Sequence, residues 1–261
     1  MIAGLILTIG SLFFMIILCI VYFSQNNEKT IETKLYKYML ITMLLLIVTE
    51  IAMCCIIYYV DNSQIKEIAV RTHWLTSVAW FYLLYSYSLA FLRDIQTTSV
   101  TKYLFSDIRI KVVNVLTVLV LIIYFFIPFS SLDKISFLPG PAAYFLITYC
   151  SIITLCIIGY TIIHGKKINA RKKKTIYIQV IILAIDMILQ ALYQDIAIEA
   201  IGAAIQMYYL YFNIENPDIK NVEELEAVKI EIDKANKAKS DFLSNICLLY
   251  TSPSPRDQRG S

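Results

Sequence analysis

Charged residues are scarce in this chain, and so are the residues that break helices and form turns. Asp, Glu, Lys and Arg make up 16% of the 261 residues, and there are only 7 glycines and 6 prolines. Soluble domains carry about 25% charged residues, so a soluble enzyme of this size would lack the polar side chains to cover its surface. The shortage of glycine and proline also excludes a long disordered chain and a turn-rich β protein.

Hydrophobic residues are in excess: they make up 58% of the sequence and lie in long runs. A membrane-spanning helix needs about 20 mostly apolar residues. Seven runs meet or approach this length: 2–24, 37–60, 73–92, 110–130, 142–163, 176–194 and 197–213. We therefore predict an all-α fold in which residues 1–213 form a polytopic seven-helix transmembrane bundle. The last two runs are the weakest, because acidic and amide residues interrupt them.

The distribution of basic residues predicts how this bundle is oriented. Cytoplasmic loops of membrane proteins carry an excess of Lys and Arg. Three alternate connections, starting with the first, are rich in them: Lys29, Lys34 and Lys37; Arg93, Lys102, Arg109 and Lys111; and Lys166, Lys167, Arg171, Lys172, Lys173 and Lys174. The opposite connections contain Lys66, Arg71 and Lys134. This bias favours an N-terminus outside and a C-terminus in the cytoplasm.

A polar segment, 214–245, follows the last apolar run and has the pattern of a cytoplasmic helix. Asn216 suits the N-cap position and Pro217 the first helical position, so we expect a break between the last span and this helix. Apolar residues recur at heptad spacing along one seam: Leu225, Val228, Ile232, Ala235 and Phe242. The seam favours a short two-stranded coiled coil, and a lone amphipathic helix is the alternative.

The end of this segment carries a specific motif. Lys239-Ser-Asp-Phe-Leu-Ser-Asn245 resembles the start of the dimerisation helix of bacterial sensor histidine kinases, just before their phosphoacceptor histidine. A seven-helix membrane region before such a linker is similar to the kinases with an N-terminal seven-transmembrane sensor. The resemblance covers residues 1–245. It implies a homodimer in the bacterial cytoplasmic membrane that passes a stimulus to a kinase core and then to a response regulator.

The chain departs from this family directly after Asn245. Leu248 stands where the resemblance puts the phosphoacceptor histidine, and no sequence typical of an ATP-binding domain follows. We therefore expect no catalytic residue and no kinase activity in the chain as written, with ATP and Mg²⁺ needed only by the missing kinase core. Residues 246–261 lack an apolar period, and we interpret them as a non-native tail that does not continue the helix. A genuine disordered tail is the alternative.

Polar residues inside the predicted spans are the candidate sensing residues. Acids within a membrane are costly and are therefore functional by default. Glu50 and Asp186 lie near the middle of their runs, and Gln190 shares a helical face with Asp186. Glu199 and Gln206 share a face of the last run. This pattern predicts either a ligand cavity in the outer half of the bundle or interhelical hydrogen bonds that hold the helices together.

The histidines and the densest basic cluster have simpler interpretations. His73 and His164 each lie at the end of a predicted span, and we interpret both as interfacial residues rather than metal ligands. The cluster 166–174 is interpreted as a topology determinant near anionic lipid, with specific phospholipid or nucleic-acid binding as the alternative. The expected partners are therefore the bilayer and a second copy of the chain, without metal or nucleic acid.

Two other functions compete with a receptor. A small transporter or channel would have inverted repeats and helices broken by Gly or Pro at midplane, and the sequence gives little sign of them. A retinal-type pump would need a lysine inside the last span, and 197–213 contains none. The polar segment 214–245 favours the receptor, with the transporter as the alternative.

The predicted orientation is testable with reporter fusions at two sites. Alkaline phosphatase fused after Tyr193 should be active, because this site is expected outside, and inactive after Asn221. A fluorescent protein should give the opposite pattern. The reverse result for both reporters would mean that one span has been miscounted.

Overall fold

The computed structural model describes residues 2–25, 30–93, 95, 99–128, 140–166, 168–194 and 196–251. These residues form helices, and no strand occurs among them. In chain order the elements are α1 (Ile2–Ser24), α2 (Ile31–Tyr59), α3 (Ser63–Arg93), α4 (Val100–Ser106), α5 (Ile108–Phe126), α6 (Pro141–Ile163), α7 (Ala170–Leu192), α8 (Glu199–Leu210), a π-helical segment (Tyr211–Glu215) and α9 (Pro217–Thr251). The predicted all-α fold is confirmed.

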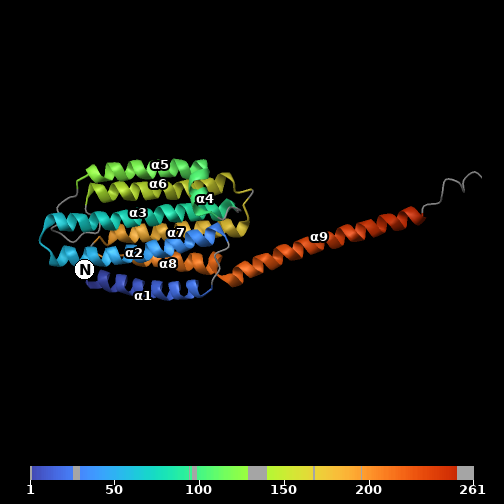
Figure 1. Ribbon diagram of the computed structural model, residues 1–261, viewed down its shortest axis with the longest axis horizontal. Coiled ribbons are helices and arrows are strands. Elements are labelled where there is room, and N and C mark those ends of the chain that lie inside the picture. The colour runs from blue at the N-terminus through green and yellow to red at the C-terminus, as the bar shows by residue number, and fades with distance from the viewer. Residues whose placement is uncertain are drawn as a thin grey trace, which may run out of the picture. The chain divides into compact units, whose positions relative to one another are not determined.

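The chain divides into two units, 1–215 and 216–261. In the first unit the long helices lie side by side in a bundle, with α4 as a short segment at one end (Figure 1). α3 lies at its centre and packs against α2, α6 and α7, while α8 packs against α1, α2 and α7. The helix-rich composition thus leads to a bundle in which distant segments of the sequence meet on α3 and α8.

Six helices of the described residues are long and apolar enough to cross a membrane: α1, α2, α3, α5, α6 and α7. α8 has 12 residues and continues for 5 more as a π-helix. A spanning helix needs about 20 residues, so α8 does not meet this measure. By length and composition the described part of the chain has six candidate spans, where the sequence predicted seven.

Helix ends differ from the ends of the apolar runs because capping, rather than hydropathy, decides where a helix starts. α2 begins at Ile31, after Thr30 caps it, and not at residue 37. α3 begins at Ser63, ten residues before the predicted start at 73. α7 begins at Ala170, where the Asn169 side chain accepts from a backbone N–H. The short helix α4, capped by Ser99, was not predicted.

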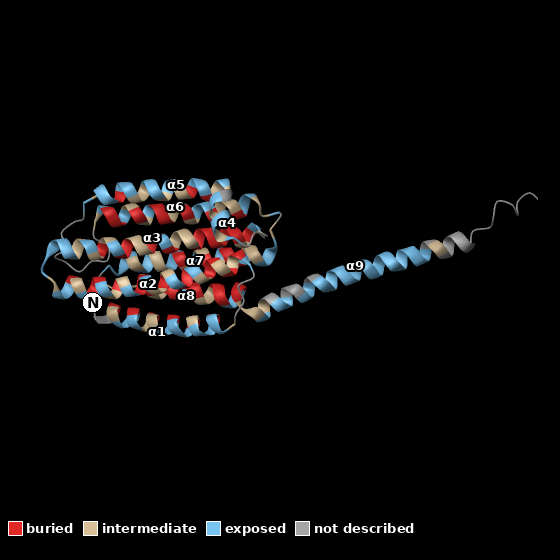
Figure 2. Ribbon diagram, in the orientation of Figure 1, coloured by how far each residue is buried: buried red, intermediate tan, exposed pale blue. Residues whose placement is uncertain are grey.

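Burial in the bundle follows the pattern expected of a protein in lipid. Large apolar side chains cover its outside, and α5 is exposed along much of its length (Figure 2). Aromatic side chains fill the inside, among them Tyr36, Trp80 and Tyr87. Contiguous apolar surface on this scale does not suit a soluble monomer. The described helices therefore support a membrane location.

The second unit contains α9. Its start is as predicted: Asn216 is non-helical, its side-chain oxygen accepts from the Asp218 backbone N–H at 3.0 Å, and Pro217 is the first helical residue. The side chains of the predicted seam are exposed, with Leu225 at 68% and Phe242 at 63%. The expectation that the helix stops after Asn245 is wrong, because α9 runs to Thr251. Leu248 lies within the helix, and residues 252–261 of the predicted tail lie outside the described residues.

Candidate functional site

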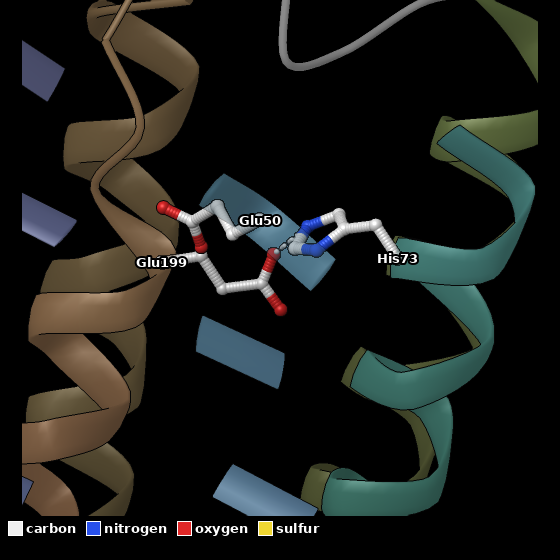
Figure 3. A group of neighbouring side chains, drawn as sticks. All are labelled: Glu50, His73 and Glu199. Carbon is white, nitrogen blue, oxygen red and sulfur yellow. Dashed lines mark hydrogen bonds and ion pairs between the residues drawn. The ribbon is translucent and has the colours of Figure 1, made fainter. Parts of the chain in front are cut away.

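Three helices bring Glu50, His73 and Glu199 together inside the bundle. Glu50 lies on α2, His73 on α3, and Glu199 is the first residue of α8. One nitrogen or oxygen atom from each residue lies within 4.8 Å of the other two. The three side chains converge from different helices (Figure 3). They are named the acid–histidine cluster below.

Glu50 is the most deeply buried member of the cluster, with no exposed surface. The Thr8 hydroxyl of α1 donates to Glu50 Oε1 at 2.9 Å and lies 3.0 Å from the carbonyl oxygen of Gly4. The backbone N–H of Ala200, in the first turn of α8, faces the same carboxylate. Glu50 Oε2 has no hydrogen-bond partner among the described residues.

Glu199 connects α8 to α3 through both of its oxygens. The Ser77 hydroxyl donates to Oε1 at 2.6 Å, and Nε2 of His73 lies 3.2 Å from Oε2. The start of a helix favours a negative charge, because the unpaired backbone N–H groups point towards it. Trp74 packs edge-on against the His73 ring, with the ring centres 6.0 Å apart. The contacts of Glu199 with Ser77 and His73 therefore hold the start of α8 against α3.

The charge of the cluster is not balanced by a lysine or arginine. No such side chain of the described residues bonds to Glu50, His73 or Glu199. An isolated charge costs several kcal/mol to bury, and two carboxylates face one imidazole here. The cluster therefore needs protons or a bound cation to be neutral.

A cavity of about 370 Å³ adjoins the cluster between α3, α6, α7 and α8. Its lining is mostly aromatic and aliphatic, and the three polar residues in it are Asp186, Gln190 and Glu199. The other lining residues are Trp74, Phe81, Tyr144, Ile147, Cys150, Met187, Ile188 and Ala191. Glu199 belongs to both the cavity and the acid–histidine cluster. A largely apolar cavity with a few converging polar groups is typical of a small-molecule site.

The polar residues of the cavity differ in their surroundings. The Gln190 side chain accepts from the Ile198 N–H at 3.0 Å and donates to the Ile196 carbonyl at 3.2 Å, so it holds the turn before α8. Asp186 lies against Gly202 of α8, where a Cβ atom would overlap the carboxylate. Asp186 Oδ1 has no hydrogen-bond partner among the described residues. Gln190 is thus structural, and Asp186 is available to a ligand.

The five polar residues singled out in the sequence do not form one site. Asp186, Gln190 and Glu199 line the cavity, and Glu50 joins Glu199 in the cluster. Gln206 is fully buried apart from them, and neither of its amide atoms has a partner among the described residues. Thr8 donates a hydrogen bond to one oxygen of Glu50, and Ser77 donates one to one oxygen of Glu199.

His73 has a contact that its interpretation as an interfacial residue did not include. It is 3% exposed and contacts Glu199, because α3 starts ten residues earlier than its apolar run and His73 lies in the third turn. His73 and two carboxylates form a group that could hold an ion, a grouping that the spacing in the sequence did not predict. The spacing of His73 and Ser77, one helical turn apart, was the signal available in the sequence.

A second buried acid lies at the opposite end of the segment that α8 and the π-helix form together. Glu215, the last residue of the π-helical segment, is 3% exposed. The Tyr87 hydroxyl of α3 donates to its Oε1 at 2.9 Å, and the Tyr36 hydroxyl of α2 donates to the Met207 carbonyl at 2.8 Å. The continuous segment formed by α8 and the π-helix is therefore held on α3 by an acid at each end, Glu199 and Glu215.

No family model, curated protein or solved structure matches this chain. The argument for function therefore rests on the residues and on their arrangement.

The hydrogen bond between Thr8 and Glu50 should contribute to stability. The substitution Thr8→Val keeps the shape and removes the hydroxyl, so it should lower the free energy of unfolding in detergent by about 1–3 kcal/mol. Thr148→Val is the matched control, because the Thr148 hydroxyl is exposed and bonds only the Tyr144 carbonyl of its own helix. Equal losses at the two positions would contradict a stabilising role for this bond.

Proposed function

We propose that this chain is the membrane signal-receptor module of a bacterial two-component sensor histidine kinase. The observation that carries the proposal is the motif Lys239–Asn245, which lies on one uninterrupted helix, α9, whose capped start follows the bundle directly in sequence. The module would act on a kinase core that uses ATP and Mg²⁺ and phosphorylates a response regulator.

The receptor model needs an odd number of spans, because the N-terminus is expected outside and α9 in the cytoplasm. α8 and the π-helical segment supply the seventh span, from Glu199 to Glu215. This segment packs against α1, α2 and α7 in the bundle, and its inner residues Ala203, Met207 and Leu210 are buried. These contacts hold the short segment in the bundle. Local thinning of the bilayer can accommodate a span of this length.

The two acids at the ends of α8 suggest how a stimulus would reach α9. Glu199 lines the cavity, and Glu215 directly precedes Asn216. A ligand that binds one arrangement of α8 and α3 more tightly than another shifts the population towards that arrangement. π-helical segments often occur at functional sites, and this one lies between α8 and the start of α9, with Glu215 as its last residue.

α9 is the output element and works as a pair. Its seam, Leu225 to Phe242, is exposed in the single chain, and its other faces are charged. A narrow apolar seam gains most of its stability from a partner helix, so two copies form a coiled coil over 214–245. The transporter alternative is weaker, because the described spans contain no internal proline of the kind that breaks transporter helices at midplane.

Fusion to a kinase core tests the proposed function. Residues 1–245 are joined to the phosphoacceptor helix and kinase core of an unrelated sensor kinase, and autophosphorylation is measured in membranes with labelled ATP. One residue inserted after Glu231 rotates the following helix by about 100°, so it should change activity several-fold. A seven-residue insertion keeps the seam in phase and should restore activity. Equal activity in all three fusions would contradict signalling through α9.

Crosslinking tests the dimer seam in a background without other cysteines. Leu225→Cys and Ile232→Cys should form crosslinked dimers in membranes, because both positions face the partner helix. Lys234→Cys, an exposed position off the seam, is the matched control and should crosslink far less. Equal crosslinking at all three positions would indicate a monomeric, lone helix.

A further inference from the structure

We propose that the acid–histidine cluster, Glu50, His73 and Glu199, is a binding site for a divalent transition-metal ion, with Zn²⁺ as the best fit. The proposal names the ligand class of the receptor, and it relies on the proposed function only for the signalling consequence of binding. The metal site itself is argued from the three side chains and their surroundings.

The donor set suits Zn²⁺. One imidazole and two carboxylates give nitrogen and oxygen ligands of the kind Zn²⁺ takes in open sites, where three protein ligands leave the fourth position to water or another ligand. Ca²⁺ and Mg²⁺ need about six or more oxygen ligands, and imidazole favours Zn²⁺, Cu²⁺ and Ni²⁺ over them. The cluster is therefore selective for transition metals by its chemistry.

The separations are near those of a metal site. Ligand atoms about 2.0–2.1 Å from a tetrahedral Zn²⁺ lie about 3.3 Å apart. Nε2 of His73 and Oε2 of Glu199 already lie 3.2 Å apart, and no pair in the cluster exceeds 4.8 Å. The three ligands come from three helices, α2, α3 and α8 (Figure 3).

The orphaned oxygen of Glu50 is the second, independent observation. Glu50 is fully buried, and its Oε2 has no hydrogen-bond partner among the described residues, although it lies in the cluster. A buried carboxylate oxygen without a partner is costly. A divalent cation would bind this oxygen and would also neutralise the two carboxylates that no lysine or arginine of the described residues balances.

Outer hydrogen bonds position the two carboxylates for such an ion. Thr8 donates to the other oxygen of Glu50, and Ser77 donates to the other oxygen of Glu199. Bonds of this kind orient metal ligands and tune their affinity. Each carboxylate thus has one oxygen that accepts a hydrogen bond from a hydroxyl. The second oxygen of Glu199 contacts His73, and the second oxygen of Glu50 has no partner among the described residues.

Metal binding would report on the arrangement of the bundle. The ion would tie α2 and α3 to the start of α8. The π-helical segment that continues α8 ends at Glu215, which Tyr87 of α3 holds. Glu199 also lines the 370 Å³ cavity, which gives an ion a route to the cluster. The site would therefore favour the arrangement in which α8 is drawn onto α3, by its higher affinity for that arrangement.

Equilibrium dialysis of the full chain in detergent tests the proposal, with Zn²⁺ alone as the probe and metal counted by mass spectrometry. One Zn²⁺ per chain is expected. Co²⁺ should bind at the same site and give the visible absorption bands of a four-coordinate ion. A wild-type chain that binds neither ion at micromolar concentration would overturn the proposal without any variant.

Isosteric variants locate the ion. Glu50→Gln and Glu199→Gln each remove one ligand and should weaken binding by at least about 100-fold, while Thr8→Val should weaken it about tenfold as an outer partner. Asp61→Asn is the matched control: this acid is exposed just after the end of α2 and lies outside the cluster, so its loss should leave affinity unchanged. Wild-type affinity in Glu50→Gln would overturn the site, and so would equal losses in Asp61→Asn and Glu50→Gln.

A thermal shift keeps the test independent of misfolding. Zn²⁺ should raise the melting temperature of the wild type and of Asp61→Asn, because a ligand that binds only the folded state stabilises it. It should not raise that of Glu199→Gln, even where this variant melts lower without metal. If the kinase fusions respond to the one-residue insertion but the chain binds no metal, the metal site is overturned and the proposed function stands. If the chain binds Zn²⁺ but all three fusions are equally active, the metal site stands and the proposed function is overturned.

Discussion

The polar contact of Glu199 with α3, at the start of α8, is the constraint on which the rest of the bundle depends. Its two oxygens engage His73 and Ser77, one turn apart on α3, so the position of α8 along α3 is set by a pair of short polar contacts. Apolar packing alone allows helices to slide in a membrane, since lipid tails are as apolar as the side chains. Specific polar contacts are therefore what fixes the register of this bundle.

The same contact organises the space around it. Gly202 follows Glu199 by three residues and has no side chain, so Asp186 of α7 fits against α8. Gln190 bridges the turn between α7 and α8. The cavity lies where these contacts leave room between α3, α6, α7 and α8. The cavity lining and the helix contacts thus share residues, and a ligand in the cavity would compete for groups that also hold the helices.

Much of the fold could be predicted from the sequence, because length and apolar composition decide which segments are helices in a membrane. The break at Asn216-Pro217 was predicted for the same kind of reason, since capping is local. The buried contact of His73 was not predicted, because α3 begins ten residues before the apolar run, in the mixed segment 63–72 that hydropathy alone does not mark as part of a span. The partners of Glu50 were out of reach, since Thr8, 42 residues away, meets it only through helix packing.

The break between the π-helical segment and α9 has a mechanical consequence. Pro217 has no N–H to donate, and the next two N–H groups bond to Asn216, so no described backbone hydrogen bond continues the helical ladder across this point. The segments on either side of Asn216 are therefore separate hydrogen-bonded units joined by covalent bonds alone, so loss of helical structure in one removes no backbone hydrogen bond from the other.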